Sequence, residues 1–213
     1  MEKRCWIVGA GDFCARDWSP REGDLVIAAD GGQGALSRLH ARADVVVGDF
    51  DSLREAPNGG EVVRLPAEKD DTDMVAALRL ALARGYRDIR IYGAAGGRID
   101  HTIANLQSLN FLARQGARGV LVEEHYSVTS ILNGEIRFAA ASRGMLSVFA
   151  QGGEARGVYL EGLKYPQHGF TLRDDYPMGV SNEFTGVPAR VAVTDGLLLV
   201  AWTGEAVVEG IKL

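Results

Sequence analysis

The chain has 213 residues, a mass of 22.9 kDa and a formal net charge of -5 at pH 7. Its 46% hydrophobic and 24% charged residues are typical of a globular protein, and no apolar run approaches the ~20 residues of a membrane-spanning helix. The negative charge gives no general attraction to nucleic acid or anionic lipid. We therefore expect neither as a partner, and a phosphorylated ligand would need a metal ion or local backbone donors.

The N-terminal residues and the cysteines favour a cytoplasmic protein. The start of the sequence, 1–9, lacks the apolar stretch and the small-residue cleavage site of a signal peptide. The two cysteines, Cys5 and Cys14, suit a reducing compartment better than a disulfide scaffold.

The first half of the chain alternates between two periodicities. Amphipathic segments at 72–84 and 102–115 predict helices that end at Gly85 and Gly116, and a further helix is expected from about Ala35. Short β-branched runs separate these segments and are typical of buried parallel strands: Cys5–Val8, Leu25–Ala29, Val45–Val47, Ile89–Tyr92 and Val120–Val122. The alternation predicts an α/β domain with a parallel sheet over residues 1–125.

The predicted helices each carry one apolar stripe. In the first it comprises Met74, Leu78 and Leu82, and in the second Ile103, Leu106, Leu109 and Leu112.

After residue 126 the helical pattern stops. Asn133-Gly134 and Asp195-Gly196 are typical of hairpin turns. The runs that resemble strands are 127–132, 145–149, 156–160, 189–193 and 197–202. Residues 126–213 are therefore expected to form an all-β, sandwich-like domain.

Glycines follow the first two predicted strands. Gly9-Ala10-Gly11-Asp12-Phe13 would let backbone amides approach a phosphate, but it lacks the third glycine of a dinucleotide fingerprint, and a tight turn explains it equally well. Ala29-Asp30-Gly31-Gly32 places an acid where α/β proteins bind ligands. The alternative for Asp30 is a helix cap.

Acidic clusters follow at two further places. In Gly48-Asp49-Phe50-Asp51-Ser52, Asp49 and Asp51 project to one side of an extended segment and would repel each other unless a cation neutralised them. Hard oxygen ligands of this kind suggest Mg²⁺, whereas a polar turn would need only one aspartate. In Glu68-Lys69-Asp70-Asp71-Thr72-Asp73, three aspartates exceed what capping the next helix requires, and Lys69 could contact a phosphate.

The segment from Gly93 to His101 joins a predicted strand to a helix. Its glycines, with Gly97 among them, and the helix N-terminus form an anion site, and Arg98 can pair with phosphate through two donors. Asp100 could instead be the helix cap, and His101 could be a surface residue.

Four of these five sites, those at 9–13, 29–32, 48–52 and 93–101, lie just beyond the carboxyl ends of predicted strands, so they converge on one edge of a parallel sheet. The combination suits Mg-nucleotide phosphoryl chemistry by positioning and charge neutralisation. Walker A and protein-kinase motifs are missing from the sequence, and the histidines lack zinc-ligand spacing with the cysteines.

Taken in order, the motifs at 29–32, 48–52, 68–73 and 96–105 resemble the bacterial thiamine pyrophosphokinase family, and Val180–Phe184 in the second half fits as well. The resemblance implies transfer of a pyrophosphoryl group from Mg-ATP to thiamine, which gives thiamine diphosphate and AMP. It also implies a homodimer whose active site is shared between the α/β domain of one subunit and the β-domain of its partner.

The resemblance also assigns roles to residues. It implies Mg²⁺ ligation by Asp49, Asp51 and Asp73, which with Asp71 and Asp100 form the catalytic set. The expected ATP and phosphate surroundings are Asp30, Lys69, Thr72, Gly97 and Arg98. Thiamine contacts are implied for Ser181 and Asn182; Trp202 is the nearest candidate for a ring-stacking residue, with a core position as its alternative.

Two rival functions remain at this stage. A hydroxymethylpterin diphosphokinase would use the same chemistry on another acceptor, but Ser181-Asn182-Glu183-Phe184 fits the thiamine family better. A non-catalytic nucleotide or thiamine sensor would have little need for clustered metal ligands.

Overall fold

The computed structural model describes residues 3–49, 60–66 and 70–213. Contacts divide the chain into two units, one of Met1–Ser108 with Leu121–Glu124 and the other of Leu109–Val120 with His125–Leu213. The division passes through helix α3 (Ile99–Arg114) and strand β6 (Arg118–Val122). Among the helices of the described ranges, none combines the length and the apolar character needed to cross a membrane.

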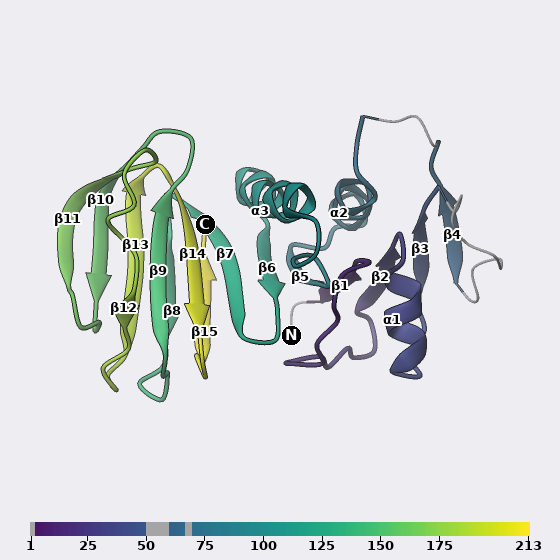
Figure 1. The fold of residues 1–213 in the computed structure, drawn as a ribbon, viewed down its shortest axis with the longest axis horizontal. Helices are drawn as coiled ribbons and strands as arrows, with labels where there is room; N and C mark the ends of the chain where they lie inside the picture. Colours follow the sequence, from purple (N-terminus) through teal and green to yellow (C-terminus); the bar gives the residue numbers. More distant parts are fainter. Residues whose placement is uncertain (1–2, 50–59, 67–69) are drawn as a thin grey trace. The chain divides into compact units, whose positions relative to one another are not determined.

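The first unit contains parallel strands in the order β5-β1-β2-β3-β4 (Figure 1). Their bounds are β1 (Arg4–Val8), β2 (Leu25–Ala29), β3 (Val45–Gly48), β4 (Glu61–Arg64) and β5 (Asp88–Tyr92). Every residue of β2 and β3 is buried, as expected for strands covered on both faces. β4 lacks this signal because it is an edge strand with mostly exposed residues, and sequence analysis did not predict it.

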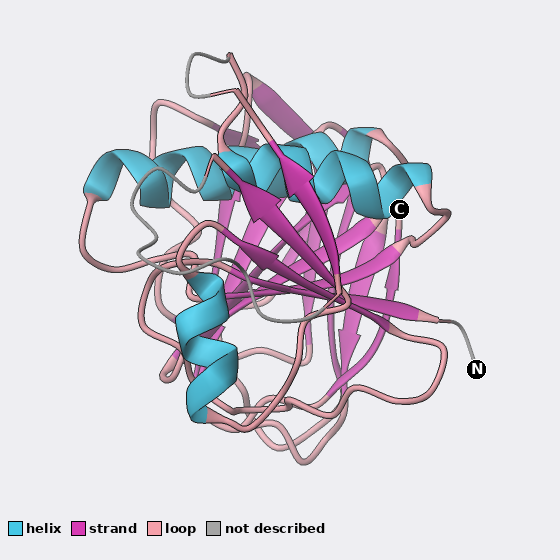
Figure 2. Cartoon of the chain, turned by 90° about the vertical axis from the view of Figure 1, so that its right-hand side faces the viewer, coloured by secondary structure: helices cyan, strands magenta, loops and turns pink. Residues whose placement is uncertain are grey.

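Helices α1 (Gly32–Arg38) and α2 (Asp73–Ala83) cover opposite faces of these strands (Figures 1 and 2). The strand order explains this arrangement. The chain moves outward from β1 to β4 and returns to β5, so right-handed connections place α2 on the face opposite α1. The order therefore reverses between the adjacent strands β1 and β5, a point where α/β sheets characteristically bind ligands.

The helices depart from prediction at their starts and in one buried face. α1 begins at Gly32, before the expected Ala35, and α3 begins at Ile99, before the expected residue 102. In α3, Leu109 and Leu112 are buried as predicted, but Ile103 is 50% exposed, and the polar Asn105 is buried instead. The buried face of α3 therefore differs from the predicted apolar stripe. Asn105 is buried because it donates a hydrogen bond to the loop that precedes the helix, a contact that hydrophobic periodicity cannot reveal.

Aromatic packing fixes the long loop between β1 and β2, which contains no helix. Trp6 and Tyr92 project from adjacent strands, and Phe13 and Trp18 of the loop lie against them with ring centroids 5.3–5.4 Å apart. The Tyr92 hydroxyl also donates to the backbone oxygen of Arg16.

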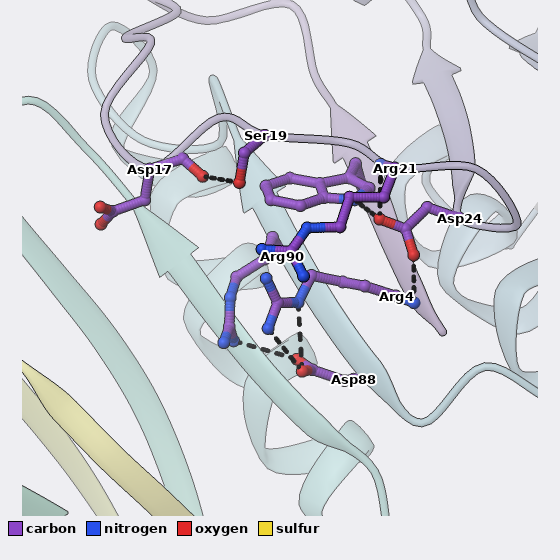
Figure 3. Close-up of polar contacts among 8 residues, drawn as sticks. Arg4, Asp17, Ser19, Arg21, Asp24, Asp88 and Arg90 are labelled. Atoms are coloured by element: carbon purple, nitrogen blue, oxygen red, sulfur yellow. Dashed lines mark hydrogen bonds and ion pairs between the residues drawn. The ribbon is translucent and has the colours of Figure 1, made fainter. Parts of the chain in front are cut away.

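A polar network closes the other end of this loop (Figure 3). Asp24 accepts hydrogen bonds from the Arg4 and Arg21 backbone N–H groups and from Trp6 Nε1, at 2.9–3.0 Å. Asp88 pairs with Arg4 at 3.0 Å and with Arg90 at 3.2 Å.

The second unit is antiparallel and contains strands in two sheets, in the orders β12-β9-β14-β7 and β11-β10-β13-β8-β15. The bounds are β7 (Tyr126–Leu132), β8 (Glu135–Phe138), β9 (Met145–Ala150), β10 (Glu154–Glu161), β11 (Gln167–Arg173), β12 (Asn182–Glu183), β13 (Ala189–Asp195), β14 (Leu197–Thr203) and β15 (Val208–Lys212). An α/β first part followed by a β-rich second part is the fold class expected from the sequence.

The two predicted hairpins are wrong, although both turns exist. β7 pairs with β14, whereas β8 and β13 pair in the other sheet, so each turn carries the chain from one sheet to the other. The turns bind each other: Asn133 Oδ1 accepts the Gly196 N–H at 2.8 Å, and the Asn133 N–H donates to Gly196 O at 3.1 Å. Such dipeptides supply the left-handed backbone of a tight turn and do not specify which strands then pair.

Candidate active site

A cavity of about 510 Å³ lies at the carboxyl ends of β1, β2 and β5, within the first unit. Its volume is within the range of small-molecule sites. It is lined by Gly9, Ala10, Gly11, Ala29, Asp30, Thr72, Asp73, Met74, Gly93, Ala94, Ala95, Gly96, Gly97, Arg98, Asp100, His101, Ala104 and Asn105. The cavity therefore occupies the point where the strand order reverses.

Two glycine-containing loops meet at one side of this cavity. The Gly11 N–H donates to Gly93 O at 2.9 Å. A Cβ atom on Gly9 or Gly11 would lie 2.7–2.8 Å from the same oxygen, and Gly93 itself has a φ of +57°. These positions need glycine because the two backbones approach each other directly.

Asp30 enters the cavity from the end of β2. Its φ of 52° is in the left-handed region, and its N–H donates to Val47 O at 2.9 Å. The N-cap of α1 is Gly31 and receives no side-chain cap bond, so the helix-cap alternative for Asp30 does not hold. Burial raises the pKa of Asp30, and the charges of Asp73 and Asp49 raise it further.

Three predicted acids, Asp30, Asp49 and Asp73, are therefore near enough to interact electrostatically, although only Asp30 and Asp73 line the cavity. Asp73 is the first residue of α2 and lines the cavity. Asp51, the other predicted metal ligand, and Lys69, a predicted phosphate contact, lie outside the described residues. Within the described ranges, no group of three or more acidic, histidine or cysteine side chains is arranged to hold a metal ion.

The remaining residues of the acidic cluster before α2 have distinct partners. Thr72 is the N-cap of α2: its Oγ1 accepts the Val75 N–H at 3.2 Å, while the residue also lines the cavity. Asp71 is paired with Arg79, at 3.1 Å between Oδ2 and Nε. Asp71 does not line the cavity, so the cluster presents Asp73 rather than Asp71 there.

Arg98 and Asp100 lie beside Gly97 at the start of α3. Arg98 Nε donates to Asp100 Oδ1 at 3.1 Å, and a second bond joins Nη2 to Oδ2. The helix begins at Ile99, so Asp100 lies in its first turn and is not the cap. The hydrogen bonds from Arg98 lower the pKa of Asp100 to about 2.

Two polar residues at this site received no role from sequence analysis. Glu123, 8% exposed, accepts the N–H groups of Ala94 and Ala95, and Asn105 Nδ2 donates to Ala94 O at 2.6 Å. Glu123 directly follows β6, so the strand-end rule that selected the other acids would have found it too.

The predicted thiamine contacts belong to the second unit. Ser181 is exposed, has a φ of 62°, and donates its N–H to Ser147 Oγ. Asn182 is buried: its Oδ1 accepts the Tyr165 N–H, and its Nδ2 donates to Tyr165 O. The side chain of Asn182 thus holds this segment, which includes the neighbouring Ser181, against the backbone of Tyr165.

Trp202 is buried in the same unit. It is 5% exposed and packs edge-to-face on Phe138 at 5.5 Å, and Phe138 packs on Phe184 at 5.1 Å. These contacts are those of a core residue, the alternative position that the sequence left open for Trp202.

Two family models and a curated relative match this chain. The model described as thiamin pyrophosphokinase, catalytic domain, matches residues 19–121, and the model of the vitamin B1 binding domain of the same enzyme matches residues 135–198. A curated relative, thiamine pyrophosphokinase of Bacillus subtilis, is 26% identical over 159 residues, covering 71% of this chain and 74% of the relative.

Solved structures extend the likeness to the fold. The thiamin pyrophosphokinase of Geobacillus thermodenitrificans superposes with a TM-score of 0.83 at 27% identity, covering 95% of this chain and 98% of that one. The Bacillus subtilis enzyme gives a TM-score of 0.85 at 23% identity, covering 95% and 100%. Both family models match in order and together span most of the sequence, so the chain belongs to the thiamin pyrophosphokinase family, enzymes that form thiamine diphosphate.

Proposed function

We propose that this protein transfers the pyrophosphoryl group of Mg-ATP to the hydroxyl of thiamine, giving thiamine diphosphate and AMP. The observation that carries the proposal is one cavity at the strand ends that is lined by Asp30, Asp73, Arg98 and two glycine loops, with Asp49 directly after β3. Backbone amides, Arg98 and carboxylates around one cavity are suited to a metal-bound polyphosphate. Family membership supports thiamine as the acceptor.

The donor atoms fit Mg²⁺. Mg²⁺ favours oxygen ligands and is usually held by one or two carboxylates together with substrate phosphates, so a site need not contain three protein ligands. Asp49 and Asp73 would hold the ion, with Asp51 as the third ligand of the proposal. When bound, Mg²⁺ would neutralise charge on the phosphates of ATP.

The chain's own groups would then position the two substrates. Arg98 would exchange its bond to Asp100 for one to a phosphate oxygen, and the loop that contains Gly97 would approach the phosphates closely. Lys69 and Thr72 would complete these surroundings, while Asp71, which is paired with Arg79 outside the cavity, would act on them only indirectly. The thiamine hydroxyl oxygen attacks the β-phosphorus, the bond from the β-phosphorus to the oxygen that bridges to the α-phosphate breaks, and the hydroxyl proton passes to a pocket carboxylate such as Asp30, whose pKa is raised.

The second part of the chain would recognise thiamine. In this proposal residues 1–125 carry ATP, Mg²⁺ and the catalytic acids, and residues 126–213 supply the exposed Ser181 for thiamine. Asn182 would hold the segment that carries Ser181 through its bonds to Tyr165, and Trp202 would support the domain from its core. The protein would be a homodimer in which each thiamine lies between the first domain of one subunit and the second domain of its partner. Exposed apolar side chains next to Ser181, among them Met178 and Val180, support such a contact.

Incubation of the purified protein with ATP, Mg²⁺ and thiamine tests the proposal, with AMP and thiamine diphosphate measured together. We expect equal amounts of both, no product without Mg²⁺, and no AMP when hydroxymethylpterin replaces thiamine. ADP with thiamine monophosphate, or absence of product, would contradict the proposal.

A further inference from the structure

Glu123 is a buried carboxylate that contacts the glycine-rich loop of the cavity from behind. It follows the end of β6 and is 8% exposed. Its Oε1 atom accepts the Ala95 N–H at 3.0 Å and the Ala94 N–H at 3.3 Å. Two neighbouring backbone donors therefore converge on one anionic oxygen, as they would on an oxygen of a bound phosphate.

Asn105 holds the same loop from α3. Its Nδ2 donates to Ala94 O at 2.6 Å, so both the N–H and the carbonyl of Ala94 are bound by buried side chains. The preceding residue, Gly93, accepts the Gly11 N–H through its carbonyl. Residues 93–95 are thus held by hydrogen bonds to Glu123, Asn105 and Gly11. The following residues, Gly96, Gly97 and Arg98, also line the cavity.

A buried carboxylate is costly unless hydrogen bonds compensate it, which argues against a merely space-filling role. The Ala94 and Ala95 amides already donate to Glu123, so they are not available to a phosphate. In this loop, Gly96, Gly97 and Arg98 remain to contact the phosphates. The direction in which those residues point depends on how the anchored part of the loop is held.

We propose that Glu123 is a positioning residue for nucleotide binding: it fixes residues 93–95 so that Gly96, Gly97 and Arg98 face the polyphosphate. The inference rests on the proposed function. It predicts that loss of Glu123 weakens binding of ATP and leaves binding of thiamine unchanged.

Three variants separate the hydrogen bonds from the charge and the volume. Glu123→Leu removes the acceptor, Glu123→Gln keeps one acceptor oxygen without charge, and Glu123→Asp withdraws the carboxylate from the loop. We expect KM for ATP to rise about tenfold in Glu123→Leu and in Glu123→Asp, with KM for thiamine within about twofold of wild type. Glu123→Gln should stay within about threefold for both substrates. Glu124→Gln, an exposed neighbour, is the matched control and should behave as wild type.

Hydrogen exchange gives a readout that does not depend on turnover. In Glu123→Leu, or in Glu123→Asp if the leucine variant does not fold, the amides of Ala94 and Ala95 should exchange faster, while those of the central strand β14 are unchanged. Direct binding of ATP with Mg²⁺, without thiamine, should weaken by the same factor as KM rises.

Several results would overturn the inference. One is that Glu123→Leu and Glu123→Asp both leave the amide exchange of Ala94 and Ala95 and the affinity for ATP unchanged. Another is a parallel rise of both KM values with a lowered melting temperature, which would indicate a general structural role. If the wild-type protein produced no thiamine diphosphate, the proposed function would fail, while ATP binding and amide exchange would still decide the role of Glu123.

Discussion

Arg98 and Asp100 form a two-pronged ion pair at the start of α3, with the Nε to Oδ1 distance at 3.1 Å. Both side chains are largely exposed, at 73% and 60%. An exposed pair of this kind contributes little to stability. Under the proposed function, Arg98 is instead available to bind phosphate.

Arg98→Ala should therefore change nucleotide binding and not the melting temperature. We expect KM for ATP to rise at least about tenfold, because a bidentate contact to phosphate is lost. Arg98→Lys should recover part of this loss, since lysine keeps the charge but not the fork. Steady-state kinetics and thermal melting check both statements, and an unchanged KM with a melting temperature several degrees lower would assign Arg98 a structural role.

Asp49→Asn and Asp73→Asn should each lower kcat by at least about a thousandfold, because a neutral amide cannot replace a carboxylate that would hold Mg²⁺. Removal of one of three mutually repelling acids should leave folding intact or strengthen it. Product formation and Mn²⁺ binding in the presence of ATP are the measurements. Asp195→Asn, at the exposed end of β13 in the second unit, is the control. Wild-type turnover in either site variant would remove that residue from the proposed metal site.

Two glycines of α1 should respond in opposite ways to the same substitution. A Cβ atom on Gly32 would lie 1.9 Å from Val8 O, whereas one on Gly34 would meet nothing within 4 Å. Gly32→Ala should lower the free energy of unfolding by about 3 kcal/mol or more, and Gly34→Ala should raise it by up to about 1 kcal/mol. Urea unfolding followed by circular dichroism compares them; equal effects would mean that α1 does not pack on β1 this closely.

Asp24 should make stability depend on pH in the acid range. Burial alone would raise its pKa, but hydrogen bonds from Trp6, Arg4 and Arg21 outweigh burial and lower it. A carboxyl with a lowered folded pKa stabilises fully above its unfolded value of ~3.9 and loses this contribution as the pH falls through the folded pKa.

The Asp24→Asn variant should consequently be less stable than wild type by about 1–2 kcal/mol at pH 7, because in either orientation of the amide its nitrogen would face at least one of the three N–H donors. The difference should shrink as the pH is lowered below about 4. Asp17→Asn is a control, since Asp17 is exposed and asparagine tolerates its φ of 60°. A stability gap that stays constant from pH 7 to pH 3 would contradict the assigned network.

The parallel strands and the strand-end acids could be predicted because both signals are local. β2 and β3 are continuous apolar runs, and Asp30 and Asp49 directly follow them. β4 and β11 could not be found in this way, since their mostly exposed side chains give no apolar run. The contact between Asn133 and Gly196 is likewise non-local, so the two dipeptides alone predict hairpins that the strand pairing does not form.

The same distinction applies to the site. The position of Asp73 follows from the start of α2, but the pairing of Asp71 with Arg79 depends on side-chain geometry two helical turns away. Glu123 also directly follows a strand, but it is not accompanied by the glycines that mark the other strand-end sites in the sequence.

The most direct measurement follows the β-phosphorus of ATP. With ATP labelled at the β-phosphate, wild-type protein, Mg²⁺ and thiamine, the account predicts that the label moves to thiamine diphosphate and that the nucleotide product is unlabelled AMP. Label that remains in ADP, with thiamine monophosphate as the other product, would contradict pyrophosphoryl transfer at this site.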